Sequence, residues 1–498
     1  MAKKTVVIVG GGTAGIVIAN NLQDYFDVIV IEKSKYLKYP KIYEIPLLIG
    51  FLYRRKVLKY ITKRELGLAG GRRIPFFESN VLGGASVING CVHVVGSRRA
   101  WSGILQNYGA DYSELIASYD HLYAAGVDGK NKINLVHAPQ NGVDKAFIKT
   151  LNTYGVPIGD MNFSESENCG PIYDTARKYF RSSVMSLLTK RDFSLSMNEE
   201  VERILIDDKG CVTGVQTDRG VVRSDYVVLS GGVIGTCGLL LRQKDMGQFP
   251  EAMVGLEIGR NIQDHTNIRV NVITKNEIGS LNEIYGSILK KVSMFFRHLL
   301  GHKTLMVGTG ATSGAHLDLD GDGVVDTRIQ VVQFTESGRH GSDGKYFLDR
   351  PGFSLSITPI HPLSSGEIKV SGQGVTVDPN YLSQNKDVEL LKLALSYCLR
   401  LLRTEPLSSF IQEIVSEDLI NDDPEAYIRE NFYSGHHLIG GAHDALGKNF
   451  DVKGVKGLYV CDASIFNAYS ASNIHSSVVL IADIFSKRFI SNYAEKSA

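Results

Sequence analysis

The stretch Thr5-Val-Val-Ile-Val-Gly10-Gly11-Gly12-Thr13-Ala14-Gly15, followed by a second apolar run at Val28-Ile-Val-Ile-Glu32, decides the fold. It predicts a buried strand, a G-x-G-x-x-G turn, a helix and a second strand ending in an acid. Gly10 allows the tight turn, Gly12 lets the backbone approach a pyrophosphate, and Gly15 lets the helix pack closely on the strand. The sequence therefore predicts the first half of a dinucleotide-binding α/β fold.

The same stretch predicts how a nucleotide would be held. Thr13 and Ala14 fall at the start of the helix, where unpaired N–H groups favour a pyrophosphate. Glu32 follows Gly15 by 17 residues (32 − 15), close to the spacing of about 20 that is typical of an acid binding the adenosine ribose hydroxyls. A glycine-rich turn without a nucleotide is disfavoured because strand, helix and acid are all in place. NAD, NADP and FAD remain open at this point.

Charge and cysteine content narrow the class of protein. The 498 residues carry 54 Lys and Arg against 53 Asp and Glu, so no general attraction to nucleic acid or to an anionic membrane is expected. A small-molecule partner fits better. The six cysteines form no C-x-x-C pair, which is typical of reduced, structural thiols.

Targeting signals are not evident. Met1-Ala-Lys-Lys leads directly into the first strand, so we expect no secretory segment and a cytoplasmic protein. No window reaches the roughly 18 apolar residues of a membrane span. The apolar run Ile45–Tyr53 is short and adjoins Arg54-Arg55-Lys56, which favours a buried loop beside a solvated basic turn over a membrane-surface contact.

A second glycine-rich turn lies at Val81-Leu-Gly83-Gly84-Ala-Ser86-Val-Ile-Asn89-Gly90. Gly83 and Gly84 allow a tight backbone whose amides could face a phosphate or a ring system.

This turn, with Cys91-Val-His93-Val-Val-Gly96 after it, resembles the first signature of the glucose–methanol–choline oxidoreductases, which are FAD enzymes. Further resemblances follow in chain order, at Val227–Leu241, Ile258–His265, Pro362–Val370, Asp378–Leu382 and Gly454–Ser464. The resemblance implies an α/β protein with a Rossmann-like, discontinuous FAD-binding domain and an α+β substrate domain of sheet and helices. We expect residues 1–105, 190–265 and 430–498 to form the first, and residues 106–189 and 266–429 to form the second, the substrate-binding or cap domain.

Three further elements are predicted from periodicity. Residues 201–230 alternate apolar and polar around two Asp/Gly turns, which predicts a short strand meander. Residues 386–403 have a helical apolar period, and Val478–Phe485 reads as a buried helix.

Residues 266–361 are expected to line or cap the substrate pocket. The aromatic and Met content of Tyr285–Phe296 hints at an apolar or aromatic alcohol, although such a stripe is more often simple core.

Two histidines near the C-terminal end are the catalytic candidates. By the resemblance, His437 is the active-site base and His475 its partner. One neutral imidazole near a flavin can take a hydroxyl proton, and the other can hold the oxygen by a hydrogen bond. We expect His436 to be a packing or supporting group, because adjacent side chains point apart in an extended chain. A metal site joining His443 to these histidines is disfavoured, since no Cys or carboxylate spacing completes it.

The dinucleotide pattern and the resemblance together assign the cofactor to residues of both glycine turns, the meander and the C-terminal segments. Asp462 is expected to meet hydroxyls or backbone amides, the alternative being a helix cap without cofactor contact. A covalent bond to FAD at His93 is disfavoured because the register differs, so non-covalent FAD is expected. The chain departs from the family pattern at Cys237, where Pro is usual, and at Gly441, where Thr is usual. The assigned residues are Gly10, Gly12, Thr13, Ala14, Gly15, Glu32, Gly83, Gly84, Ser86, Asn89, Gly90, Cys91, Val201, Asp462, Ala463, His475 and Ser476.

An acidic loop is the remaining motif. Asp318, Asp320, Asp322 and Asp326 follow the D-x-D-x-D-G start of a calcium loop, but Ile329 stands where an EF-hand has its bidentate Glu. A solvated Asp/Gly turn is favoured, and any bound calcium would be structural.

The sequence thus predicts an FAD-dependent oxidation of a primary or secondary alcohol, with electrons passed to O2 or a quinone-type acceptor. Two alternatives on the same fold are hydroxynitrile lyase chemistry and light-driven decarboxylation of fatty acids. The latter would need a basic anchor in the substrate domain.

Overall fold

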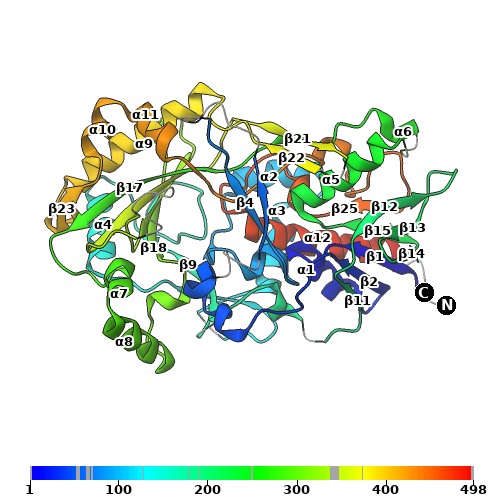
Figure 1. The fold of residues 1–498 in the computed structure, drawn as a ribbon, viewed down its shortest axis with the longest axis horizontal. Coiled ribbons are helices and arrows are strands. Elements are labelled where there is room, and N and C mark those ends of the chain that lie inside the picture. Colours follow the sequence, from blue (N-terminus) through cyan, green and yellow to red (C-terminus); the bar gives the residue numbers. More distant parts are fainter. Residues whose placement is uncertain are drawn as a thin grey trace.

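The computed structural model describes residues 3–51, 57–62, 68, 71–126, 128–178, 180–188, 190–247, 249, 251–336, 347–372 and 374–494. The molecule is elongated, with a parallel sheet at one end and a larger antiparallel sheet at the other (Figure 1).

The parallel sheet confirms the predicted nucleotide-binding topology. Its strand order is β11-β2-β1-β15-β25 and every neighbouring pair is parallel. The predicted strand, helix and strand are β1, α1 (Thr13–Leu22) and β2, with the central residues of β1 fully buried. The strands are β1 (Thr5–Val9), β2 (Asp27–Glu32), β11 (Ser194–Met197), β15 (Tyr226–Leu229) and β25 (Leu458–Val460).

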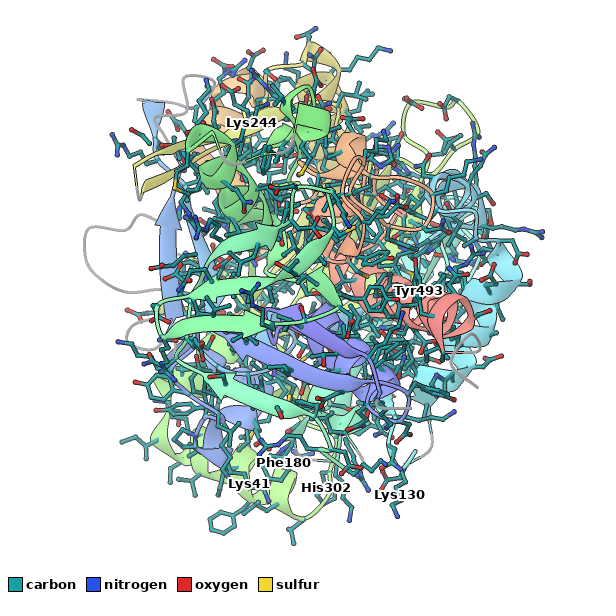
Figure 2. All side chains as sticks on the ribbon, turned by 90° about the vertical axis from the view of Figure 1, so that its right-hand side faces the viewer. Lys41, Lys130, Phe180, Lys244, His302 and Tyr493 are labelled. Atoms are coloured by element: carbon teal, nitrogen blue, oxygen red, sulfur yellow. The ribbon has the colours of Figure 1, made fainter. Side chains whose placement is uncertain are left out.

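Helix α12 (Ile474–Tyr493) contains the predicted buried run and packs against α1. Asn21 Nδ2 on α1 donates to Asp483 Oδ1 on α12 at 2.8 Å. Figure 2 views the molecule from the end with the parallel sheet, where Tyr493 closes α12. Helix α5 (Gly232–Asp245) follows β15. Helices α2 (Arg98–Asn107) and α3 (Tyr112–Leu122) come earlier in the chain, and α3 packs against α12.

The predicted meander is confirmed as the antiparallel sheet β12 (Val201–Ile206), β13 (Val212–Thr217) and β14 (Gly220–Arg223). Smaller sheets are made by β3 (Val57–Ile61) with β4 (Pro75–Ser79), and by β16 (Arg260–Ile262), β21 (Gly366–Ser371) and β22 (Gly374–Asp378). A five-stranded sheet contains β5 (Val92–His93), β6 (Tyr123–Ala125), β7 (Ile133–His137), β9 (Tyr173–Arg177) and β10 (Phe180–Arg181).

The larger sheet has the order β23-β17-β20-β19-β18-β8, with β24 paired to β17, and its pairs are antiparallel. Its strands are β8 (Asn168–Pro171), β17 (Thr266–Thr274), β18 (Ala311–Leu317), β19 (Thr327–Val332), β20 (Gly352–Pro359), β23 (Ile411–Ile414) and β24 (Tyr433–Ser434). The predicted helix at 386–403 is α9 (Asn385–Leu402), which packs on this sheet. The remaining helices are α4 (Gly142–Thr153), α6 (Glu251–Val254), α7 (Leu281–Gly286), α8 (Ile288–Leu299), α10 (Glu417–Asp422) and α11 (Pro424–Asn431).

The prediction for Tyr285–Phe296 needs correction. Tyr285 borders the central cavity, but α8 projects from the molecule with its apolar side chains exposed. It is therefore neither core nor pocket wall.

The parallel sheet takes its strands from 1–105, 190–265 and 430–498, and the larger sheet takes all but β24 from 106–189 and 266–429. All six cysteines are free. Within the described part of the chain, none of the helices has the length and hydropathy needed to cross a bilayer. Of the run Ile45–Tyr53, Ile45 is buried and Pro46–Phe51 form a 3₁₀ helix, while 52–56 lie outside the described residues.

Candidate active site

The first glycine turn lies where β1 passes into α1. Gly10 has φ of 103°, and a Cβ there would approach the carbonyl oxygen of Ser230 to 2.6 Å. A Cβ at Gly15 would lie 1.9 Å from the oxygen of Gly10. At Gly12, by contrast, the nearest such atom is 3.8 Å away. Gly10 and Gly15 thus close the turn, and Gly12 leaves room for a ligand beside the unpaired N–H groups of the first helical turn.

The second glycine turn packs directly on the first. Gly84 has φ of 60°, and a Cβ there would lie 2.7 Å from the Cα of Gly12. The Gly83 N–H donates to the Gly11 oxygen at 2.8 Å. Ser86 Oγ donates to the Gly83 oxygen at 2.7 Å, which holds the turn together.

Glu32 is buried at the end of β2 beside this cradle. Its two carboxylate oxygens accept from the N–H groups of Gly11 at 2.6 Å and Ser34 at 2.7 Å. The side chain lines the cavity. Because a carboxylate oxygen has two lone pairs, Glu32 fixes the glycine turn and retains acceptors for a ribose hydroxyl.

A single cavity of about 1080 Å³ joins the glycine turns to the two candidate histidines. Four of the assigned residues, Gly15, Gly83, Ser86 and Ser476, lie outside its wall; Ser476 Oγ donates instead to the Val94 oxygen. The assigned residues on the wall are Gly10, Gly12, Thr13, Ala14, Glu32, Gly84, Asn89, Gly90, Cys91, Val201, His437, Asp462, Ala463 and His475.

Asp462 follows β25 and is buried against the cavity. One carboxylate oxygen accepts from the Gly232 N–H at 2.9 Å and from Thr236 Oγ1 at 2.6 Å. The other accepts from the N–H and hydroxyl of Ser464, at 2.8 and 2.6 Å. Burial raises the pKa of Asp462, and these hydrogen bonds oppose the rise. The carboxylate meets hydroxyls and amides as expected, and it also caps the short helix Ala463–Ile465.

His437 reaches the cavity from the loop that follows β24. Its Nδ1 lies 3.0 Å from Nδ1 of His265, and Nε2 of His265 lies 3.2 Å from the carbonyl oxygen of Ile360. A Cβ at Gly435 would lie 2.9 Å from His437 Nδ1, so glycine makes room for this contact. Burial lowers the pKa of His437 to about 3, helped by the charge of Arg328. His437 is therefore a neutral imidazole at pH 7.

Asp264 positions the loop that carries His437. The buried carboxylate accepts from the His437 N–H at 2.7 Å, from the Tyr381 hydroxyl at 2.6 Å and from Ser434 Oγ. Burial raises the pKa of Asp264 to about 6, and the hydrogen bonds limit the rise. Asp264 and His265 belong to Ile258–His265, one of the segments that resemble the family pattern. The resemblance pointed to this segment, but no role was predicted for either residue.

His475 is the second residue of α12 and lines the same cavity. Burial lowers its pKa to about 4, and the charge of Arg181 contributes. Its Nε2 is buried and has no hydrogen-bond partner among the described residues. The structure thus brings His437 and His475 to one cavity, both neutral.

Sequence reasoning missed Arg328. This residue of β19 is buried in the cavity wall, and its Nη2 donates to Asn473 Oδ1 at 2.5 Å. Within the described part of the chain its Nε and Nη1 have no hydrogen-bond partner, and burial lowers its pKa to about 10. Strand β19 reads Thr-Arg-Ile-Gln-Val-Val, and no motif in it singles out the arginine.

The other histidines have different surroundings. His436 is exposed at the cavity edge, with its ring 5.5 Å from that of Phe77. His443 Nδ1 lies 3.2 Å from the Tyr108 hydroxyl, away from the cavity wall. His93 is buried with its ring 4.6 Å from that of Tyr123 and does not line the cavity.

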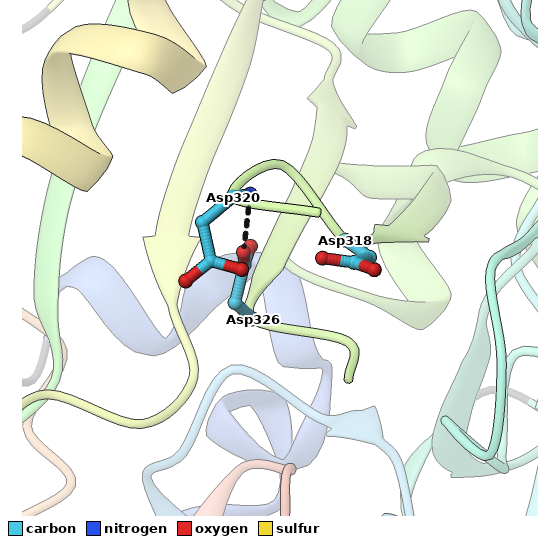
Figure 3. A group of neighbouring side chains, drawn as sticks. All are labelled: Asp318, Asp320 and Asp326. Carbon is cyan, nitrogen blue, oxygen red and sulfur yellow. Dashed lines mark hydrogen bonds between the residues drawn. The ribbon is translucent and has the colours of Figure 1, made fainter. Parts of the chain in front are cut away.

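The acidic loop forms a turn held by its own backbone (Figure 3). Ligand oxygens of Asp318, Asp320 and Asp326 lie within 4.8 Å of one another, the single such group among the described residues. Asp322 is not part of this group. Asp318 accepts from the N–H of Gly321 at 2.8 Å and from that of Gly323 at 2.7 Å. The carboxylates of the loop thus accept hydrogen bonds from its own backbone.

The chain is similar to known proteins over nearly its whole length. Two family models described as GMC oxidoreductase match residues 5–267 and 362–482. The chain is 24% identical over 536 residues to an oxygen-dependent choline dehydrogenase of Photobacterium profundum, covering 96% of this chain and 91% of that protein. It is also 24% identical over 547 residues to a Drosophila melanogaster protein named glucose dehydrogenase [FAD, quinone], covering 96% and 85%. The crystal structure of a pyridoxine 4-oxidase from Mesorbium loti superposes with a TM-score of 0.82 at 20% identity, covering 98% and 99% of the two chains.

Proposed function

Because this chain belongs to the GMC oxidoreductase family, whose members bind FAD, we propose that it oxidises a primary or secondary alcohol to the carbonyl with His437 as the base. The observation that carries the proposal is the cavity that joins the glycine cradle to His437 and His475.

The residues present fit FAD. The open backbone at Gly12 and the start of α1 suit a pyrophosphate, and the free lone pairs of Glu32 suit a ribose. Asp462, Ala463 and the Asn89–Cys91 loop would lie beside the ring system. When bound, FAD supplies the acceptor for the substrate hydride. We propose non-covalent binding, since His93 lies off the cavity and burial raises the pKa of the Cys91 thiol to about 11.

The hydrogen-bond chain behind His437 fixes its tautomer. A carbonyl oxygen only accepts, so His265 Nε2 carries the hydrogen that it donates to Ile360. His265 is neutral, because burial holds its pKa well below the usual range, so its Nδ1 is an acceptor. His437 Nδ1 must then be the donor, which leaves the lone pair of His437 on Nε2. That atom receives the hydroxyl proton of the substrate.

His475 and Arg328 would act on the substrate oxygen. The neutral His475 lines the same cavity and offers a ring nitrogen for orienting the hydroxyl. The guanidinium of Arg328 adds a fixed positive charge that favours developing alkoxide character.

The proposal is tested by His437→Ala. The variant should retain FAD but reduce it at least about a hundredfold more slowly under anaerobic mixing with an alcohol, as expected for a lost general base. His436→Ala is the matched control and should stay within about twofold, because His436 lies outside the relay. Equal rates in wild type and His437→Ala would remove His437 from the mechanism.

We propose an apolar or aromatic alcohol as substrate. The cavity wall away from the glycine turns is aromatic, with Phe77, Tyr285, Phe334, Phe347, Phe432 and Tyr433. An anaerobic flavin-reduction screen over aliphatic, aromatic, polyol and sugar alcohols checks this. Repeating reoxidation with O2 and with a quinone assigns the acceptor.

Arg328 also supports a second candidate, light-driven decarboxylation of a fatty acid, which needs a basic anchor in the substrate domain. Turnover of a fatty acid only under blue light would establish it. Turnover of a cyanohydrin without flavin bleaching would instead point to lyase chemistry.

A further inference from the structure

Helix α8 presents an apolar stripe to solvent. The stripe consists of residues spaced as on one face of a helix and is continued by Leu300 after the helix ends. Leu289 is 82% exposed, Phe296 59% and Leu300 77%. The members of the stripe are Ile288, Leu289, Val292, Phe295, Phe296 and Leu299. A helix on a water-soluble surface normally turns such a face toward the core.

The opposite face of α8 packs on the protein, and it is the more polar one. Lys290, Met294 and His298, spaced four residues apart, are the least exposed residues of the helix. His298 is buried with Nδ1 3.0 Å from Thr304 Oγ1, and Lys290 pairs with Glu277 at 2.5 Å. These inward contacts hold the helix in an orientation that directs its apolar stripe outward.

Two cations flank the stripe. At 100° per residue, Lys291 lies about 40° beyond Phe295 on one side and Arg297 about 80° beyond Leu289 on the other. Both cations are exposed, and neither forms an ion pair with a described residue. Glu277 and Glu283, the neighbouring acids, are occupied by Lys290. An apolar face flanked on both sides by exposed cations complements an anionic surface with an apolar interior.

Further basic groups lie at the same end of the molecule. Figure 1 shows α8 projecting at the lower edge, and in Figure 2 the labelled Lys41, Lys130 and His302 lie at that lower end. The helix also adjoins the cavity, because Lys291 Nζ lies 5.7 Å from the ring centre of Tyr285, a cavity-lining residue.

We propose that α8 docks this protein onto an anionic lipid bilayer surface. The apolar stripe inserts at the level of the headgroups and upper acyl chains, while Lys291 and Arg297 reach back to lipid phosphates. A contact between two copies is disfavoured by charge, since it would bring the cationic edges of two stripes together without free acids between them. The inference stands apart from the proposed reaction.

Flotation of the full-length, FAD-loaded protein with vesicles tests the proposal. Wild type should bind vesicles of phosphatidylcholine with 30% phosphatidylglycerol and bind pure phosphatidylcholine far more weakly. The Leu289→Ser/Phe296→Ser variant should bind the anionic vesicles at least about tenfold more weakly, because it removes two inserted side chains. Ile158→Ser is the control, since Ile158 is 64% exposed on another part of the surface and should leave binding unchanged.

A second variant tests the charges. Lys291→Gln/Arg297→Gln should weaken binding to the anionic vesicles about 25-fold, at roughly fivefold per cation. Lys149→Gln/Lys386→Gln removes two exposed lysines elsewhere and should have little effect. Equal binding of wild type and both α8 variants, or no binding above pure phosphatidylcholine, would overturn the proposal. So would a lipid-free dimer, seen by light scattering, that Leu289→Ser/Phe296→Ser dissociates.

Discussion

His265 affects the proposed reaction through its hydrogen bond with His437. Replacing it by Phe removes the acceptor for His437 Nδ1–H, so His437 is free to carry its hydrogen on Nε2 instead. We expect His265→Phe to slow flavin reduction about 10- to 100-fold, within the range of a general base. The tautomer of His437 should change in ¹⁵N NMR spectra.

His265→Gln provides the control, because its amide can accept from His437 and donate to Ile360. It should recover most of the rate. If His265→Phe and His265→Gln slow the reaction equally, or if the tautomer of His437 is unchanged in His265→Phe, then His265 does not set that tautomer.

The pH dependence of flavin reduction is a second prediction at this scale. Burial holds the pKa of His437 at about 3 and that of His475 at about 4, so both are neutral down to pH 5. Protonation would remove the acceptor on Nε2, but only well below pH 5. A ¹⁵N NMR titration between pH 5 and 9 should therefore show both rings neutral throughout, and a midpoint near 6.5 for either ring would contradict the neutral pair. A step in the flavin-reduction rate near pH 6 is expected from Asp264, whose buried carboxylate holds the His437 loop and has a pKa of about 6.

The sequence could predict His437 and His475 because the family motifs carry them, and both line the cavity. Arg328 could not be placed, because it comes from a strand without a motif and its effect depends on which face of the sheet meets the cavity. The relay through His265 likewise depends on a contact over 172 residues of sequence.

Among the elements, the paired glycine turns give a prediction. Gly84→Ala places a Cβ against the Gly12 backbone at a left-handed φ, and should cost at least about 2 kcal/mol of stability as well as weakening FAD binding. Thermal unfolding and calorimetric titration with FAD measure both.

Gly103 in α2 is the matched control, since a Cβ there meets nothing within 4 Å. Gly103→Ala should raise stability by about 0.5–1 kcal/mol, as alanine does within a helix. Equal effects of the two substitutions would mean that the turns are not closely packed.

Two departures from the family pattern meet in the structure. A Cβ at Gly441 would lie 2.7 Å from Sγ of Cys237, so a small residue at 441 accommodates the cysteine on α5. The aromatic and Met content of Tyr285–Phe296 predicted pocket lining or core, but composition does not tell which face of a helix meets protein. Contacts of Lys290 and His298 with residues outside the helix determine which face of α8 packs on the protein.

For the whole molecule, buried histidines couple stability to pH. Burial lowers the pKa of His316, on β18, to about 3 in the folded state from an ordinary value near 6.5. Because the pKa is lower in the folded state, His316 contributes to the free energy of unfolding. This contribution is complete above pH 6.5 and is lost as the pH falls toward the folded pKa. Between pH 7.5 and 5 the loss is about 2 kcal/mol.

His316→Gln cannot titrate, so its free energy of unfolding should fall by about 2 kcal/mol less than that of wild type over this range. Urea unfolding at the two pH values measures the difference. Parallel losses in both proteins would show that His316 does not contribute to the acid sensitivity.

The nucleotide-binding half was predictable in detail because β1, α1 and β2 are contiguous and carry their own turn chemistry. The larger sheet could be predicted only from the family resemblance. Its strands β18, β19 and β20 are buried on both faces, so they lack the apolar and polar alternation that marks a strand. Their order in the sheet depends on long-range pairing.

The strand order of the parallel sheet also has a consequence for biosynthesis. Strand β25 begins 453 residues after β1 (458 − 5), yet both belong to one five-stranded sheet. At ribosomal rates of about 5–20 residues per second, the first βαβ unit waits roughly 20–90 s for its last strand and for α12 to cover it. During that time the apolar faces of β1 and α1 are available to chaperones on the nascent chain, so the cofactor cradle is among the first parts made and among the last completed.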